Sequence, residues 1–412
     1  MKELEKILFK SLEDISIELF PDQFDDNPGI AGNAGVALYF SYLHLLTRED
    51  KHASQASRLI ENSVINLNKA LDNSFAGTAG VAWVVQHLVN IGILDESTTE
   101  NLIDIDKFLD DTIKIDLEAG DYDLFHGLIG KGIYYIERYQ YKKSNDIVRT
   151  IKKIIDGLNS ISEKSNEGIT WRYKIGNELN EHTHSLGLAH GIPSIISFLS
   201  SASKLNLDLP IVNELIAGAS EWLLKKRIDN NQFSFHSYTS PDLEEGENGS
   251  SRLAWCNGDL GVSIALLSAS KTINSELLYK EAINIAIKTC NRDLKDSGVF
   301  QSNGFVDPNF CHGISGIAHI YGRLFKITGL DIFLYRHKYW LQELMNHRVE
   351  GCGIAGFVSD IWMSFDPIKG KAVKKWGSSP SLVTGTAGVG LVLLSALKKN
   401  ATNWDKMFFT NI

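Results

Sequence analysis

Residues 384–397 read TGTAGVGLVLLSAL, a short glycine motif followed at once by an almost uninterrupted apolar run. A run of this kind behind a glycine turn is typical of a helix that is buried on most sides. The motif recurs along the chain, so the sequence contains an internal repeat. Its seven copies are AGNAG at 31–35, AGTAG at 76–80, HGLIG at 126–130, HGIPS at 190–194, NGDLG at 257–261, HGISG at 312–316 and TGTAG at 384–388.

Amphipathic stretches lie between the motifs. Residues 147–158, IVRTIKKIIDGL, and residues 279–294, YKEAINIAIKTCNRDL, place apolar residues three and four positions apart. The alternation of buried and amphipathic helices predicts two layers, and seven hairpins closing on themselves predict an all-α fold, an α/α toroid (barrel) of about 14 helices. No linker divides the chain, so we expect residues 1–412 to form a single domain.

Three stretches depart from the helical pattern. They are ITWRYKI at 169–175, QFSFHSY at 232–238 and GCGIAGFVSDIWMSF at 351–365. Aromatic and β-branched residues favour strands. We therefore expect short strand-containing insertions near 160–182, 228–250 and 348–376.

The composition sets limits on location and partners. With 412 residues, of which 43% are apolar, the chain can bury a large core. Its net charge of −9 argues against a nucleic-acid surface, and we interpret the short basic run at 369–375 as a solvated loop rather than a dock for an acidic partner. Neither a signal peptide nor an apolar run of membrane-spanning length is evident, so we expect a cytoplasmic protein without a transmembrane segment.

The positions just before the first glycine of the motif collect histidine and cysteine. His126, His190 and His312 directly precede that glycine, and Cys256 and Cys311 stand one residue earlier in two consecutive copies. Equivalent positions of a closed repeat lie at the same end of the fold, so the two cysteines should come close together. The chain has only four cysteines, and in a reducing compartment this usage indicates metal binding or catalysis rather than disulfides.

Cys256, Cys311 and His312 together offer two thiolates and one imidazole, which suit zinc. Three protein ligands leave a fourth position for water or substrate, as in catalytic zinc sites. The alternative is that all three simply pack in the core. Cys352, between two glycines, is a possible fourth ligand that would close the site, whereas Cys290 lies in an amphipathic stretch and is expected to pack.

Three motifs inside the repeat resemble the lanthionine synthetase C-like family, of the nisin-cyclase type. They are LAHG at 188–191, WCNG at 255–258 and CHGISG at 311–316, and the likeness covers nearly the whole chain. The resemblance implies an α-toroid that closes thioether rings by adding peptide cysteines to dehydroalanine or dehydrobutyrine. It implies a dehydrated precursor peptide as substrate, a separate dehydratase and an export transporter as partners, and a location that includes peripheral association with a membrane-bound biosynthetic complex.

The resemblance also places zinc on Cys256, Cys311 and His312 and implies active-site roles for three further residues. His190 is the expected general acid, because the pKa of an imidazole can lie near the working pH. Asp123 would orient or charge His190, and Arg252 would stabilise an enolate or hold Asp123. Ordinary structural roles remain open for all three, namely a polar pair at a helix start for His190 and Asp123 and an ion pair for Arg252. The other imidazoles expected near the site are His126 and His184.

Two other functions are compatible with the same motifs. One is intermolecular addition of glutathione to dehydroamino acids in proteins, as in eukaryotic members of the family. The other is a non-catalytic zinc toroid that serves as the scaffold of a peptide-modifying complex. Glycosidase chemistry fits less well, because it usually needs two carboxylates across a cleft and the motif positions offer only Asp123 and Asp259.

Overall fold

A computed structural model of the chain describes residues 2–19, 27–67, 72–172, 174–175, 178–179, 184–228, 233–236, 239–240, 250–366, 371–398 and 402–412. The chain divides into two compact units, and each is described by itself. Unit 1 comprises Met1–Lys69 and Ser297–Trp404, and unit 2 comprises Ala70–Asp296 and Asp405–Ile412. The single domain expected over residues 1–412 stays a prediction.

Each of the seven motifs opens a buried helix whose N-cap is the first glycine of the motif. We refer to these as the inner helices. In α10, for example, every residue from Asp259 to Ser270 is buried. Unit 1 contains α2 (Asn33–Thr47), α12 (Ile314–Thr328) and α14 (Thr386–Leu397), and unit 2 contains α4 (Thr78–Asn90), α6 (Leu128–Tyr141), α8 (Ile192–Ser203) and α10 (Asp259–Thr272).

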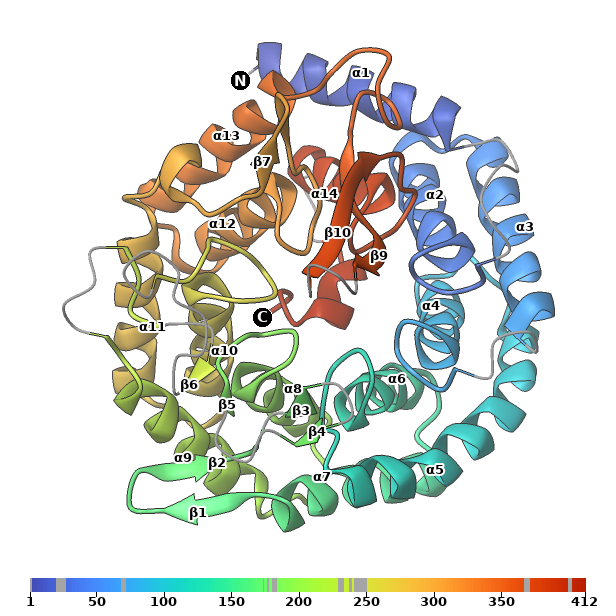
Figure 1. Ribbon diagram of the computed structural model, residues 1–412. Helices are drawn as coiled ribbons and strands as arrows, with labels where there is room; N and C mark the ends of the chain where they lie inside the picture. Colours follow the sequence, from blue (N-terminus) through green and yellow to red (C-terminus); the bar gives the residue numbers. More distant parts are fainter. Residues whose placement is uncertain are drawn as a thin grey trace. The chain divides into compact units, whose positions relative to one another are not determined.

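Amphipathic helices form the second layer in each unit (Figure 1). In α7 the residues Ile147, Ile151, Ile154 and Leu158 are buried at helical spacing, and the opposite face is polar. Unit 1 contains α1 (Lys2–Glu18), α3 (Asp50–Asn66) and α13 (Asp331–Asn346), and unit 2 contains α5 (Leu102–Ala119), α7 (Asn145–Ser160), α9 (Val212–Lys225) and α11 (Glu276–Thr289). The described residues thus contain the expected 14 α-helices, and the all-α class is confirmed. None of these helices has the length and apolar character needed to cross a bilayer.

Inner helices lie side by side within each unit. In unit 2, α6 packs between α4 and α8, and α8 packs against α10; in unit 1, α14 packs between α12 and α2. Glycines allow the close approach, because a Cβ on Gly132 would lie 2.4 Å from the ring of Phe198 and one on Gly390 would lie 2.4 Å from the ring of Tyr39. Neither position can take a side chain without moving its neighbour.

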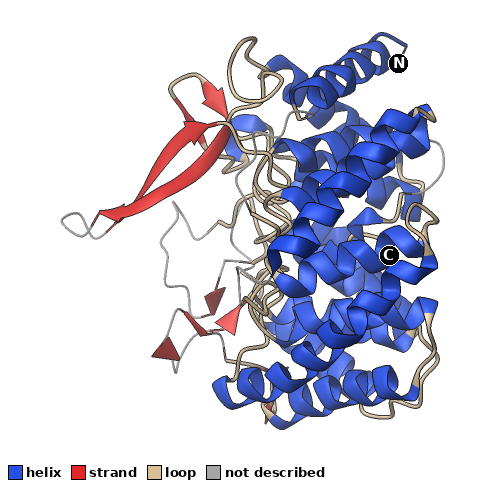
Figure 2. Ribbon diagram, turned by 90° about the vertical axis from the view of Figure 1, so that its right-hand side faces the viewer, coloured by secondary structure: helices blue, strands red, loops and turns tan. Residues whose placement is uncertain are grey.

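The strands are short and form two-stranded antiparallel sheets. The longest pair, β9 (Ser359–Asp366) and β10 (Lys371–Gly377), projects away from the helices as a hairpin (Figure 2). The other strands are β1 (Glu163–Ser165), β2 (Gly168–Thr170), β3 (Lys174–Ile175), β4 (Glu178–Leu179), β5 (His184–Ser185), β6 (Thr239–Ser240), β7 (Gln301–Ser302) and β8 (Phe305–Val306). Strands thus occur in all three stretches where insertions were expected.

Two local expectations were wrong. Within the predicted strand at 232–238, residues 233–236 are loop, because the Asp259 carboxylate accepts from the Phe235 N–H at 2.6 Å and contacts His236 Nδ1 at 2.8 Å; the remaining three residues lie outside the described part. The basic run at 369–375 is not a loop from residue 371 onward, where it belongs to β10. Residues 369 and 370 lie outside the described residues.

Replacing Gly258 by alanine is expected to destabilise unit 2. Gly258 caps α10 with a φ of +105°, and an added Cβ would lie 2.3 Å from the carbonyl oxygen of Arg252. We expect the free energy of unfolding, measured with urea, to fall by about 1–3 kcal/mol or more. Gly120→Ala is the control, since Gly120 also has a positive φ but a Cβ there meets nothing within 4 Å. An equal loss for both variants would show that the approach of the Arg252 carbonyl does not matter.

Candidate active site

The loops that precede the inner helices share one turn. In six of them an Asn, Asp or Ser side-chain oxygen accepts a hydrogen bond from the backbone N–H two residues later. The residue pairs are Asn27 and Gly29, Asp72 and Ser74, Asp121 and Asp123, Ser185 and Gly187, Asp307 and Asn309, and Ser379 and Ser381. The turn fixes the backbone just before these six helices, where His126, His190, Cys311 and His312 stand.

Equivalent positions of successive loops meet within each unit. In unit 2 the N–H of Phe75 donates to the carbonyl of Phe125 at 2.7 Å, and the N–H of Ala189 donates to that of Cys256 at 3.0 Å. In unit 1 the N–H of Cys311 donates to the carbonyl of Val383 at 3.0 Å. All of these residues stand two positions before the glycine cap. The loops of His190 and Cys256 are therefore joined directly.

His190 and Asp123 form an ion pair in unit 2. Nδ1 of His190 lies 2.6 Å from Oδ2 of Asp123. The other carboxylate oxygen accepts from the backbone N–H groups of Phe125 at 2.6 Å and His126 at 3.1 Å, so the buried carboxylate cannot rotate freely. The side chain of His190 is 31% exposed. A fixed carboxylate thus supports an imidazole that solvent or substrate can reach.

The two groups shift each other's pKa. Burial alone would lower the pKa of His190, but the charge and hydrogen bond of Asp123 outweigh it, and the pKa is raised; negative charge on Cys256 and Asp121 acts in the same direction. Burial alone would raise the pKa of Asp123, but the charge and hydrogen bond of His190 lower it. Both shifts favour a protonated imidazole beside an ionised carboxylate.

The local turn does not by itself require a carboxylate at Asp123. At the equivalent position of other loops, Asn309 and Ser381 accept the same kind of backbone N–H bond through an amide and a hydroxyl oxygen. The second oxygen of Asp123 is therefore the one that distinguishes it, and this oxygen contacts His190. A purely local capping role therefore explains Oδ1 of Asp123 but not Oδ2.

Aromatic side chains and the C-terminal segment hold the loop of Cys256. Trp255, which is fully buried, donates from Nε1 to the carbonyl of Phe408 at 2.8 Å and packs edge-on against the rings of Phe125 and Phe408. The ring of Phe125 in turn lies 5.9 Å from the ring of His190. Cys256 itself is buried. These contacts connect the cysteine, the histidine and residues 405–412 within unit 2.

The remaining residues expected in this region have different settings. Arg252 lies in the loop that leads to α10, and its side chain is half-buried. His126 is exposed and contributes its backbone N–H to Asp123. His184 is engaged elsewhere: its Nδ1 lies 2.9 Å from the Trp171 carbonyl, and its ring packs against Trp222. The structure thus pairs His190, rather than these two histidines, with the Asp123 side chain.

Unit 1 carries Cys311 and His312, both half-buried, with Sγ and a ring nitrogen within 4.8 Å of each other. Nε2 of His312 lies 3.1 Å from Oδ2 of Asp307, which is fully buried. Our reading of the sequence missed Asp307 and Asn309. The signal was present, because Asp307 stands six residues before its glycine, as Asp121 does in the third motif.

The residues present fit a zinc ion chemically. Cys256 belongs to unit 2 and Cys311 and His312 to unit 1. Two thiols and an imidazole are a donor set of catalytic zinc, and a zinc-bound histidine usually has a carboxylate on its other nitrogen, as Asp307 provides for His312. Cys352 is half-buried in a turn of unit 1. Cys290 is buried at the end of α11, where its Sγ contacts the Ala286 carbonyl at 3.5 Å, as expected of a packing residue.

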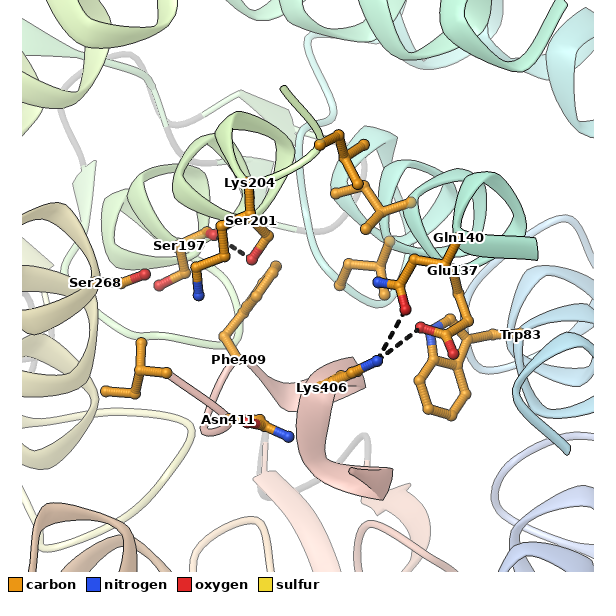
Figure 3. A pocket seen from close by; sticks show the side chains of 14 residues that line it. Trp83, Glu137, Gln140, Ser197, Ser201, Lys204, Ser268, Lys406, Phe409 and Asn411 are labelled. Atoms are coloured by element: carbon orange, nitrogen blue, oxygen red, sulfur yellow. Dashed lines mark hydrogen bonds and ion pairs between the residues drawn. The ribbon is translucent and has the colours of Figure 1, made fainter. Parts of the chain in front are cut away.

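A cavity of about 400 Å³ in unit 2 contains none of the residues expected in the active site. It lies at the later turns of α6 and α8 against the C-terminal segment (Figure 3). Nζ of Lys406 lies 2.9 Å from Oε1 of Gln140 and 3.7 Å from Oε2 of Glu137 there. Burial would raise the pKa of Glu137, but the charge and hydrogen bond of His87 outweigh it and lower the pKa to about 2. Three of the polar side chains that line this cavity, Lys406, Gln140 and Glu137, are thus tied to one another.

Known proteins resemble the chain over most of its length. The solved structure of nisin cyclase superposes with a TM-score of 0.71 at 17% identity, covering 100% of this chain and 98% of that one, and this confirms the expected fold class, an α/α toroid. Glutathione S-transferase LANCL1 of Danio rerio is 21% identical over 337 residues, which are 79% of this chain and 76% of the relative. The family described as lanthionine synthetase C-like protein matches residues 23–409. The chain therefore belongs to the lanthionine synthetase C-like family.

Proposed function

We propose that the protein is a zinc-dependent peptide cyclase that forms lanthionine and methyllanthionine rings. It would add cysteine thiolates of a dehydrated precursor peptide to dehydroalanine or dehydrobutyrine during lanthipeptide maturation. The observation that carries this proposal is the ion pair of His190 and Asp123. The loop that contains His190 is hydrogen-bonded to the loop that contains Cys256. Membership of the family and the fold shared with nisin cyclase support the same reaction class.

Cys256, Cys311 and His312 are the proposed zinc ligands. Residues two positions before the glycine cap are hydrogen-bonded between neighbouring loops in three cases, Phe75 with Phe125, Ala189 with Cys256 and Cys311 with Val383. Cys256 and Cys311 are consecutive members of the same series in the sequence. Their sulfurs and the imidazole are ligands that zinc prefers. Zinc bound there would lower the pKa of a substrate thiol, so that the thiolate nucleophile is available at neutral pH.

His190 is proposed to supply the proton that completes the addition. The new S–Cβ bond forms as the C=C π bond breaks, which leaves negative charge on the α-carbon and its amide oxygen until a proton reaches the α-carbon. His190 is the donor because Asp123 keeps its pKa raised. Arg252 is proposed either to stabilise charge on the amide oxygen or to hold Asp123. The proton lost by the thiol equals the one gained at carbon, so cyclisation is an isomerisation.

Glutathione addition to dehydroamino acids is a second candidate, because the Danio rerio relative is named a glutathione S-transferase. The same thiolate and proton-donor chemistry would serve a free thiol.

For the ring-forming reaction we also propose a dehydratase and an export transporter as partners. The proposed location is the cytoplasm, including peripheral association with a membrane-bound complex of these partners.

The decisive experiment gives the protein a dehydrated peptide that contains cysteine. Because cyclisation leaves the mass unchanged, alkylation of free thiols is the readout. We expect the thiols to disappear in a zinc-dependent manner, and a chelator should return the rate to that of the enzyme-free reaction. The ring pattern is compared with the enzyme-free product, since some dehydroamino acids react without a catalyst.

A dehydroalanine peptide without cysteine, incubated with and without glutathione, separates the candidates. If peptide thiols persist while glutathione adds readily, the intermolecular reaction replaces cyclisation. If neither reaction occurs with zinc bound, the protein is a non-catalytic scaffold and the enzymatic proposal is wrong.

A further inference from the structure

We propose that Asp307 is a positioning residue of the metal site, which holds His312 in the tautomer and ring orientation that present Nδ1 to zinc. This inference rests on the proposed function, because His312 must be a ligand. It starts from the contact of 3.1 Å between Nε2 of His312 and Oδ2 of Asp307. Asp307 is fully buried, whereas the side chain of His312 is 12% exposed.

The backbone and side chain of Asp307 are fixed from several directions. Its N–H donates to the carbonyl of Phe300 at 3.0 Å, and its carbonyl accepts from the N–H of Ile314, in the first turn of α12, at 3.0 Å. The backbone N–H of Asn309 donates to Oδ1 at 3.0 Å, and the Asn309 amide donates to Oδ2 at 2.9 Å. The carboxylate therefore has one defined position, and His312 must adapt to it.

The carboxylate of Asp307, oriented by Asn309, decides which nitrogen of His312 carries the proton. Oδ1 of Asn309 accepts from the backbone N–H of His312 at 2.9 Å, so Nδ2 faces the carboxylate of Asp307. This Nδ2 also lies 3.2 Å from Nε2 of His312. A lone pair on Nε2 could accept from this Nδ2, but it would face the acceptor-only carboxylate oxygen of Asp307 at 3.1 Å and be repelled. A proton on Nε2 instead donates to the carboxylate, and this charge-assisted bond is the stronger of the two. The proton therefore belongs on Nε2, and Nδ1 keeps the lone pair that a metal needs.

The turn alone does not require an aspartate at this position. Ser185 and Ser379 form the equivalent turn with a hydroxyl oxygen, and Asp72 forms it with Oδ1 while its Oδ2 accepts from the Ser74 hydroxyl at 2.8 Å. Only one side-chain oxygen is needed for the turn. The second oxygen of Asp307 is the one that contacts His312, and it distinguishes this loop.

A nearby carboxylate defines a rival arrangement. Ligand atoms of Asp307, His312 and Asp360 all lie within 4.8 Å of one another, and Asp360 is buried at the start of β9. A cation held by these oxygens would not depend on cysteine. We place the metal on the cysteine sulfurs and assign Asp307 the role of orienting the His312 imidazole. The Asp307 carboxylate already contacts the Asn309 amide and the His312 ring nitrogen.

The test replaces Asp307 by serine in the full chain, which preserves the turn as Ser379 does and removes the second oxygen. Zinc affinity is measured by competition with a chromophoric chelator, and the apo and zinc-bound Tm are recorded. We expect Asp307→Ser to weaken zinc binding about 10- to 100-fold. The cobalt-substituted protein should keep its thiolate charge-transfer bands while its ligand-field bands shift. Asp72→Ser is the matched control and should bind zinc like the wild type.

The outcomes separate this inference from the proposed function. If the wild type binds zinc through cysteine but Asp307→Ser binds it equally well, the positioning role is wrong. If zinc binding is weakened equally in Asp307→Ser and Asp72→Ser, and Tm falls in both, Asp307 serves only to form the turn and the positioning role is again wrong. If the Cys311→Ala variant retains the metal and the Asp307→Ser variant loses it, the carboxylates rather than the cysteines bind the cation. Zinc that is insensitive to Cys311 and Asp307 alike would reject the proposed site as a whole.

Discussion

Cys311→Ala is expected to lose most of the zinc that the wild-type protein carries, and with it the catalysed reaction. Removing one of three protein ligands leaves a single thiolate and an imidazole, too few donors to retain the ion through purification. Metal analysis of the wild type should find about one zinc per chain. Cyclisation by the variant, followed by thiol alkylation, should proceed at the rate of the chelated wild type. Cys256→Ala should behave in the same way.

The control for this prediction is Cys290→Ala. Cys290 is buried like Cys256, but its Sγ contacts a carbonyl of its own helix at 3.5 Å, and it stands outside the glycine motifs. The variant should keep zinc and lose only the stability that comes from packing a small side chain. Full zinc retention in a double variant without Cys256 and Cys311 would remove the metal site from the proposal.

The sequence predicted the helices well because their signals are local. A glycine that lets the backbone turn, followed by an uninterrupted apolar run, determined where α14 and its six counterparts begin. The spacing of Ile147, Ile151 and Ile154 likewise determined the buried face of α7. Such patterns need no knowledge of distant residues.

Tertiary contacts decided what the sequence could not. Residues 233–236 are loop although their aromatic content favours a strand, because Asp259 binds the backbone N–H of Phe235. Asp307 was not singled out from the sequence, and only the contact of its second oxygen with His312 distinguishes it from other turn residues. The pairing of Asp123 with His190 joins two hairpins, and the family resemblance alone suggested it.

His190→Asn is expected to slow cyclisation about 100-fold or more while leaving zinc content and Tm close to the wild type. Asparagine is similar in size and can still hydrogen-bond to Asp123, but it has no proton to give at neutral pH. The measurement is kcat for loss of alkylatable thiols in the zinc-loaded protein. The matched variant His184→Asn should change the rate little, because the His184 ring is engaged with Trp171 and Trp222. A normal rate for His190→Asn would move the proton donor to His126 or His184.

Asp123→Asn distinguishes a proton donor from a merely structural histidine. Without the carboxylate, the burial that lowers the pKa of His190 loses its largest opposing contribution, so the imidazolium loses its proton at lower pH than in the wild type. If protonated His190 is needed, the alkaline limb of the profile of kcat/KM against pH must move to lower pH, with zinc content unchanged. Asparagine keeps an oxygen for the backbone N–H groups of Phe125 and His126, so the turn should persist. A uniform fall in rate without a displaced limb would mean that Asp123 only shapes the loop.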